Sequence, residues 1–193
     1  MKQLNLFKDD STPYHVKKPR LIMGKQELID WKQRVFNAQR QAMEFREQQS
    51  LFDMNSYNVS PLLAVRQADE IDPFSLDRKP FDFYRNPNVG GQCLIYFVID
   101  HGLPIVLYVG ETKLSAKQRW GNHDCELYNK RYIELHRKYD LPVAINISFW
   151  YDTPTRRSDR LKLEESLIKK FKSPFNKENW ALWGQPFCKE AYI

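Results

Sequence analysis

Six polar side chains between positions 96 and 176 could together hydrolyse a phosphodiester bond. This reaction needs a positioned water molecule, positive charge around the phosphate in the transition state and help for the leaving oxygen. A carboxylate can bind a divalent metal ion, a guanidinium can hold the phosphate, and tyrosine or histidine can orient water or relay a proton. The six candidates are Tyr96, Tyr108, Arg119, His123, Glu164 and Asn176.

Glu164 is the expected metal ligand. The segment 155–172 has the periodicity of an amphipathic helix and ends before Pro174. Its apolar face comprises Leu161, Leu167, Ile168 and Phe171. Glu164 lies amid this face, whereas Glu165 is displaced towards its edge. An isolated carboxylate there is costly unless it binds a cation or accepts hydrogen bonds. The alternative is an ordinary pair between Glu164 and a nearby lysine.

Arg119 and His123 are one helical turn apart, so they are expected on the same helical face. The planar guanidinium of Arg119 suits a phosphate, and His123 could relay a proton or steer a tyrosine hydroxyl. The alternative is that both are ordinary solvated side chains. Asp124 and Cys125 follow His123 directly, and consecutive residues on a helix point in different directions, so these three are not expected to bind a metal together.

Tyr96 and Tyr108 are expected on two strands of a hairpin, at 92–100 and 105–109, which brings them near each other. Core packing is the default interpretation of such a pair. A tyrosine with a pKa of about 10 is a poor base at neutral pH, so catalysis would need a nearby cation such as Arg119 or a bound metal. Gly110 would let the backbone approach the phosphate closely.

The order of these elements resembles the GIY-YIG nuclease superfamily, over about residues 91–180. The elements are Leu94-Ile95-Tyr96, Tyr108-Val109-Gly110, Arg119 with His123, and Glu164 followed by Asn176. The family's metal glutamate stands four residues before an isoleucine and twelve before an asparagine, which Glu164 satisfies and Glu165 does not. Two departures indicate a divergent branch: Leu94 replaces the usual glycine, and the stretch from Tyr108 to Arg119 is one residue longer.

The resemblance implies an α+β fold with a small three-stranded antiparallel sheet flanked by helices, here with a helical N-terminal extension. It also implies a DNA endonuclease that depends on Mg²⁺ (or Mn²⁺), with Glu164 as the metal ligand. In the family, the first tyrosine (Tyr96) is proposed to activate the attacking water and the second (Tyr108) to orient water and phosphate. Asn176 is expected to act as a scaffold around the site.

The rest of the chain is expected to extend this catalytic domain. A seam of apolar residues at steps of three and four predicts an N-terminal amphipathic helix that packs on the core, on a second copy or on a partner. Further core elements are expected as a helix at 125–138 and a strand at 144–151. The expected parts are an extended or disordered arm (1–24), the amphipathic helix (25–54), a proline-rich wrapping linker (55–90), the nuclease domain (91–180) and an aromatic C-terminal tail (181–193).

Composition favours an anionic partner. The 193 residues carry a net charge of +6 and a pI near 9.1, although such a balance alone separates neither nucleic acid nor membrane nor acidic protein. No apolar run or signal peptide indicates a membrane, and three widely spaced cysteines read as reduced thiols of a cytoplasmic protein without structural zinc. DNA contacts are expected from Lys17, Lys18, Arg20, Arg156, Arg157, Arg160 and the lysines of the last helix.

Two short peptides suggest a protein partner. Gln3–Phe7 (QLNLF) and Gln48–Phe52 (QQSLF) are similar to the peptides by which many bacterial proteins dock on the DNA polymerase sliding clamp. The first lies in the arm and is the candidate; the second extends the helical seam and is expected to pack. The alternative function is therefore a non-cleaving DNA-binding or clamp-docked adaptor on the same fold. Oligomeric state and the choice between repair, restriction and DNA mobility leave no signature in the residues.

Overall fold

The computed structural model describes residues 23–50, 61–80, 94–112 and 124–187. Arg119, His123, the Gln3–Phe7 peptide and most of the predicted arm lie outside the described residues. The described elements are α1 (Lys25–Ser50), α2 (Pro61–Glu70), β1 (Arg78–Pro80), β2 (Leu94–Asp100), β3 (Ile105–Thr112), α4 (Asp124–Lys138), β4 (Ile145–Trp150), α5 (Arg157–Phe171), a 3₁₀ turn (Lys177–Asn179) and α6 (Trp180–Trp183). None of the described helices is both long and apolar enough to span a bilayer.

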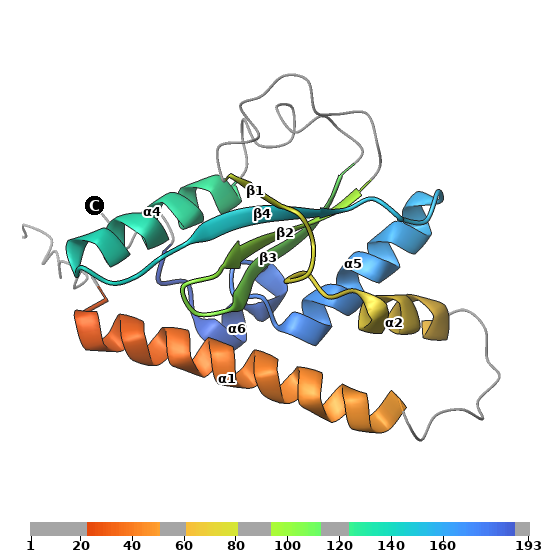
Figure 1. The fold of residues 1–193 in the computed structure, drawn as a ribbon, viewed down its shortest axis with the longest axis horizontal. Helices are drawn as coiled ribbons and strands as arrows, with labels where there is room; N and C mark the ends of the chain where they lie inside the picture. The colour runs from red at the N-terminus through yellow and green to blue at the C-terminus, as the bar shows by residue number, and fades with distance from the viewer. Residues whose placement is uncertain (1–22, 51–60, 81–93, 113–123, 188–193) are drawn as a thin grey trace, which may run out of the picture.

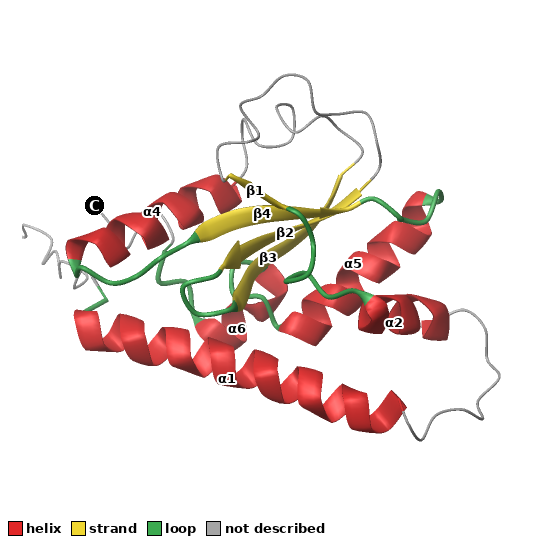
Figure 2. Cartoon of the chain, viewed as in Figure 1, coloured by secondary structure: helices red, strands yellow, loops and turns green. Residues whose placement is uncertain are grey.

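The sheet has four antiparallel strands in the order β1-β4-β2-β3, so the prediction of three was wrong (Figure 2). The additional strand, β1, pairs with β4 through Arg78 opposite Ser148 and Pro80 opposite Asn146. Its three residues are at most half-buried and show no apolar alternation. Backbone pairing with an open sheet edge creates this strand, and a proline is tolerated there because the strand lies at the edge.

The interval 55–90, expected as a linker, contains α2 as well as β1. Lys170 of α5 fixes the end of α2, because its buried Nζ donates hydrogen bonds to the carbonyl oxygens of Ala68 (2.8 Å), Asp69 (3.2 Å) and Ile71 (3.2 Å). A cation at a helix C-terminus satisfies carbonyls that have no partner within the helix. Lys170 is therefore a structural residue and does not belong to the expected DNA-binding set.

Helices cover both faces of the sheet, as Figure 1 shows. All seven residues of β2 are buried, and the first six alternate between two apolar clusters. Leu94, Tyr96 and Val98 face α1 and α4, whereas the residues between them face α2 and α5. A strand covered on both faces reads as a continuous apolar run, which is the pattern of the sequence here. The central hairpin is therefore the core of the fold.

The N-terminal helix packs on this core, which decides among the three partners left open by its apolar seam. Leu28, Trp31 and Val35 of α1 are buried in the cluster that contains Tyr96. The Trp31 ring makes an edge contact with Phe187 at a centroid distance of 5.4 Å, and its Nε1 donates to the carbonyl of Trp183 (3.1 Å). Helix α1 is thus an integral layer of the described fold.

A buried polar cluster ties α1 to the end of β2. Lys32 Nζ lies 2.7 Å from Asp100 Oδ2, and the Tyr132 hydroxyl donates to the same oxygen (2.8 Å). Burial opposes ionisation of Asp100, but the hydrogen bonds and charge of Lys32, with help from Ala144 N and Tyr132, lower the pKa of this carboxyl below its ordinary value. His136 Nδ1 lies 2.8 Å from the Tyr132 carbonyl and so donates to it, which leaves Nε2 to accept from Lys32 (3.4 Å).

Lys32→Met should lower the free energy of unfolding by about 3 kcal/mol, because it leaves a buried carboxylate without its cation. Urea denaturation measures this change. Lys25→Met, at an exposed position of the same helix, is the matched control and should change stability by less than about 0.5 kcal/mol. Equal effects of the two substitutions would contradict a structural role for the buried pair.

Stability should fall as the pH decreases below about 6.5, the ordinary pKa of histidine. Burial and the charge of Lys32 lower the pKa of His136 despite its hydrogen bond to Tyr132. The unfolded chain therefore takes up a proton in a range where the folded protein resists it, and this favours unfolding. His136→Gln can keep both hydrogen bonds without titrating. Its thermal midpoint should vary less than that of the wild type between about pH 7.5 and 5.5; His101, whose pKa is also lowered, leaves a residual slope.

Candidate active site

The site is built on β3, an edge strand whose outer hydrogen-bonding groups are satisfied by helices and loops. The register against β2 shifts between Val98 and Ile99, which leaves Leu107 as an extra residue. The side-chain amide of Gln39 in α1 accepts from Val106 N (2.9 Å) and donates to Val106 O (2.8 Å). After α5, Phe175 N donates to Leu107 O (2.9 Å), and the side-chain amide of Asn176 bonds both N and O of Val109 (2.9 Å each). Glu164 Oε1 of α5 accepts from Glu111 N (3.0 Å). Three separate segments thus fix the strand that carries Tyr108.

Asn176 takes the place of a neighbouring strand. Its side-chain amide accepts from the N–H of Val109 and donates to the carbonyl of the same residue. The Ser173 hydroxyl donates to Asn176 Oδ1 (2.6 Å), so the amide orientation is fixed, and the side chain is buried. These hydrogen bonds tie the segment after α5 to β3.

The two tyrosines lie on the same face of the hairpin. Tyr108 is opposite Val98 and therefore diagonal to Tyr96, and the two ring centroids are 5.8 Å apart at an interplanar angle of 31°. Tyr108 lines the pocket described below. Tyr96 is only 1% exposed and belongs to the apolar cluster beneath it. The hairpin therefore brings the pair together as expected, with the second tyrosine at the pocket wall.

Gly110 makes room for the ring of Tyr96. The two residues are directly opposite in the β2–β3 ladder. A Cβ added at Gly110 would lie 2.5 Å from the Tyr96 hydroxyl oxygen and 2.7 Å from Cε1. The ring of Tyr96 thus fills the space that a side chain at position 110 would need. Close approach of the backbone to a phosphate stays a prediction.

Glu164 and Arg160 of α5 hold Glu111 from two sides. Glu164 Oε1 accepts from the backbone N–H of Glu111, and the Arg160 Nε donates to the Glu111 carboxylate (3.0 Å). Arg160 is 2% exposed and also donates through Nη1 to the carbonyls of Pro154 (3.0 Å) and Thr155 (2.8 Å). Its assignment to DNA contacts was therefore wrong, because burial and pairing leave no exposed charge there.

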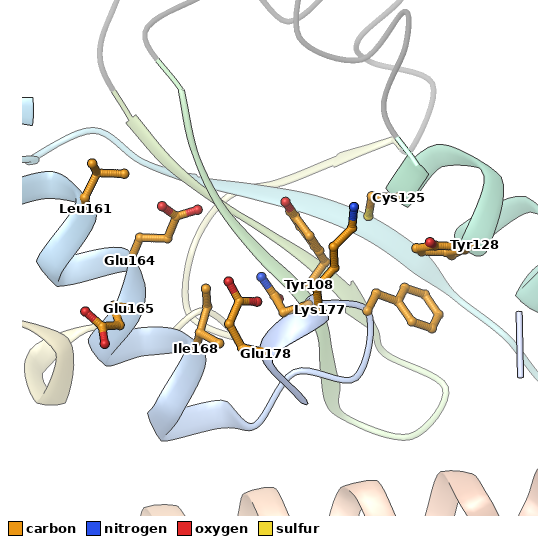
Figure 3. Close-up of a pocket in the computed structure, with 11 residues that line it drawn as sticks. Tyr108, Cys125, Tyr128, Leu161, Glu164, Glu165, Ile168, Lys177 and Glu178 are labelled. Atoms are coloured by element: carbon orange, nitrogen blue, oxygen red, sulfur yellow. The ribbon is translucent and has the colours of Figure 1, made fainter. Parts of the chain in front are cut away.

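The neighbouring glutamates of α5 have different surroundings. Glu165 is exposed and pairs with Lys169 (2.6 Å), whose hydrogen bond and charge lower the pKa of the Glu165 carboxyl. Glu164 is half-buried and lies in the pocket wall, as Figure 3 shows. The predicted difference between the two positions is thus present in the fold. Leu161, expected on the buried face, is instead 40% exposed and lines the pocket.

The pocket has a volume of about 390 Å³. On one side it is lined by α5, and on the other by the start of α4 and the segment after Pro174 (Figure 3). The lining residues are Tyr108, Cys125, Tyr128, Leu161, Glu164, Glu165, Ile168, Phe175, Asn176, Lys177 and Glu178. Three predicted residues, Tyr108, Glu164 and Asn176, therefore meet at one cavity.

The donor set of this pocket fits a hard divalent cation that completes its coordination with water and phosphate. Glu164 supplies a carboxylate oxygen donor in the same pocket as the Tyr108 ring, whereas Glu165 is paired with Lys169. Among the described residues, no three His, Cys, Asp or Glu side chains converge into a group that could hold a metal. Mg²⁺ is commonly bound through one or two carboxylates, with waters and substrate phosphates as the other ligands. Glu164, oriented by the Glu111 amide, suits that arrangement.

Sequence reasoning missed several residues of the site. Lys177 and Glu178 directly follow Asn176 and could have been found by proximity alone. Tyr128 and Glu111 carry no local signal, because their place depends on how α4 and α5 pack against the sheet.

Comparison with known proteins assigns the residues of the pocket to one domain. The GIY-YIG catalytic domain family model matches residues 92–179, which agrees with the expected range of 91–180 and confirms the resemblance. The match begins just before β2 and ends in the turn after Asn176, so it contains the hairpin, α4, β4 and α5. Searches of curated proteins and of solved structures gave no significant match.

Gly110→Ala should destabilise the protein by about 2 kcal/mol, because the added methyl group overlaps the Tyr96 ring in a strand that is pinned along both edges. Urea denaturation measures the loss. Gly24→Ala is the control, since a Cβ there would lie 3.5 Å from its nearest neighbour, Glu27 Oε2. A Gly110→Ala protein as stable as the wild type would refute the close contact between the two strands.

Proposed function

The chain carries a GIY-YIG catalytic domain over residues 92–179, and on that basis we propose that it is a Mg²⁺-dependent DNA endonuclease. Such domains are typical of nucleases, with DNA as the corresponding substrate. The observation that supports this proposal best is a half-buried carboxylate, Glu164, that is held by a backbone amide and shares a pocket with Tyr108. A surface built only for binding DNA would need positive charge rather than a fixed carboxylate.

Glu164 is the proposed ligand for Mg²⁺ or Mn²⁺. A bound divalent ion would supply positive charge to the phosphate oxygens and to the leaving oxygen. The chain contributes the orientation of the carboxylate: Glu111 N–H fixes Glu164 Oε1, and the Arg160 guanidinium holds Glu111 in turn. This chain of contacts should keep Glu164 in place when a negatively charged substrate enters.

The tyrosine pair is proposed to position the attacking water. Tyr108 lies in the pocket wall, and Tyr96 stacks beside it with its hydroxyl above Gly110. A tyrosine accepts a proton only if a cation stabilises the phenolate. Arg119, whose guanidinium would also hold the scissile phosphate, is proposed for this role, with His123 as the proton relay.

Asn176 is proposed as a positioning residue. Both of its hydrogen bonds to β3 are made to Val109, the residue between Tyr108 and Gly110. Loss of this amide would leave the N–H and carbonyl of Val109 without these partners and would let the strand that carries Tyr108 move. Asn176 thus acts on the water through Tyr108 rather than by contact with the reacting atoms.

DNA affinity is proposed to depend on exposed cations that flank the pocket. Arg156 and Arg157 at the start of α5 are exposed, unlike the buried Arg160 and Lys170. Arg157 lies seven residues before Glu164, so it projects from nearly the same side of the helix, two turns away. It is therefore placed to contact a backbone phosphate beside the one that is cut.

Glu164→Gln should reduce cleavage of supercoiled plasmid by about three orders of magnitude, because a metal ion at the phosphate is worth several kcal/mol of transition-state stabilisation. Folding and DNA binding should remain nearly unchanged, since the amide oxygen of glutamine can still accept from Glu111 N–H. Conversion of plasmid to nicked and linear forms, with Mg²⁺ or with a chelator, measures the activity.

Glu165→Gln is the matched control, and it should cleave like the wild type because its carboxylate pairs with Lys169 at the surface. Loss of plasmid cleavage in Glu165→Gln, with cleavage retained in Glu164→Gln, would show that the metal ligand has been misassigned. A wild-type protein that binds plasmid, nicked, branched and single-stranded DNA but cuts none of them with Mg²⁺ or Mn²⁺ would favour a non-cleaving adaptor instead.

A further inference from the structure

The pocket has two chemically different ends. The α5 end presents the carboxylates of Glu164 and Glu165, whereas the opposite end presents the aromatic ring of Tyr128 (Figure 3). Phe175, whose ring centroid lies 6.0 Å from that of Tyr128, also lines the pocket. A metal ion held by Glu164 would account for a phosphate at the first end. Nothing in phosphodiester hydrolysis requires aromatic surface at the second end.

The orientation of the Tyr128 ring is set by edge contacts with other aromatic residues. Its centroid lies 6.0 Å from that of Phe175 at 61°, and 6.1 Å from that of Trp180 at 73°. Phe175 is 4% exposed and belongs to the core, while Tyr128 is half-buried and packs against it. A ring supported by the core in this way is a rigid and partly apolar wall of the pocket.

A positive charge accompanies this aromatic wall. Lys177 lines the same pocket, and its Nζ lies 5.7 Å from the centroid of the Trp180 ring. Lys177 is exposed, in contrast to the buried Lys170. Flat aromatic rings for stacking, with a cation beside them for the backbone, are the combination by which proteins hold single nucleotides of nucleic acid.

The size of the pocket agrees with such a ligand. Its volume of about 390 Å³ lies in the range of cavities that enclose small organic molecules. A phosphate group with one cation would leave most of the aromatic end unfilled. A nucleobase is flat, largely apolar on its faces and covalently attached within reach of the phosphate that is cut.

We propose that the Tyr128 end of the pocket receives the nucleobase of a nucleotide next to the scissile phosphate. This inference rests on the proposed nuclease function and specifies its substrate class. A base within a duplex reaches such a pocket only after it leaves the stack, which costs a few kcal/mol and least for an unpaired base. The protein therefore prefers DNA in which that nucleotide is unpaired, as in a bulge, mismatch or branch.

The test uses two otherwise identical DNA duplexes, one with a single bulged 2-aminopurine and one with the same base paired. Affinity is measured in the presence of a chelator, which prevents cleavage, from the change in 2-aminopurine fluorescence and by gel shift. Cleavage is measured in parallel in the presence of Mg²⁺. Wild-type protein should bind and cut the bulged duplex more tightly and faster than the paired one. Stacking on the Tyr128 ring should quench the fluorescence of the bulged 2-aminopurine.

Substitutions at Tyr128 isolate the ring. Tyr128→Leu and Tyr128→Met remove the flat surface but keep apolar volume, so one remains informative if the other does not fold; each should weaken binding of the bulged duplex by about tenfold, within the range for one stacked base. Tyr128→Phe should behave like the wild type. Tyr151→Leu, at a tyrosine that is 49% exposed and does not line the pocket, is the matched control.

The outcomes distinguish failure of the stacking site from failure of the proposed nuclease activity. Cleavage without preference for the bulged duplex, or binding and quenching that survive in Tyr128→Leu and Tyr128→Met, would overturn the stacking site and leave the nuclease intact. Quenching that is lost in those variants, in a protein that cuts neither duplex, would support the stacking site and overturn the nuclease.

Discussion

The open edge of β3 is the constraint on which the rest of the site depends. An edge strand presents N–H and carbonyl groups that must find partners, and here α1, α5 and the segment after α5 supply them in place of another strand. The same contacts fix both Tyr108, on the strand, and Glu164, on the helix. The hydrogen bonds that satisfy the backbone of β3 therefore also assemble the pocket.

The covering of this edge explains why parts of the chain outside the catalytic domain matter to it. Gln39 belongs to α1, which precedes the domain by many residues, yet its amide bonds Val106 at the start of β3. The pair between Lys32 and Asp100 anchors the same helix at the other strand of the hairpin. Helix α1 thus supports the hairpin at two points, and the extension is a structural part of the site's scaffold.

Two charged side chains of α5 illustrate how burial changes the meaning of a residue. In the sequence, Arg160 and Lys170 look like DNA-binding cations. In the structure, Arg160 forms an ion pair with Glu111, and Lys170 caps the C-terminus of α2. Both form multiple hydrogen bonds within the protein, which compensates for their desolvation. The exposed cations of this region include Arg156, Arg157 and Lys177.

The sequence by itself determined the hairpin, its tyrosine pair, the helices α1, α4 and α5, and the difference between Glu164 and Glu165. These features follow from periodicity and spacing, which are local and so can be read along the chain. Only the tertiary structure decided the fourth strand, the capping of α2 by Lys170, the contact of Gly110 with Tyr96 and the place of Tyr128 in the pocket. Each of these joins residues that the sequence pattern does not connect. The fourth strand and Lys170 provide hydrogen-bond partners for backbone groups, whereas Gly110 and Tyr128 are placed by the packing of side chains. Many residues of the chain could have met these needs, so packing settles which of them do.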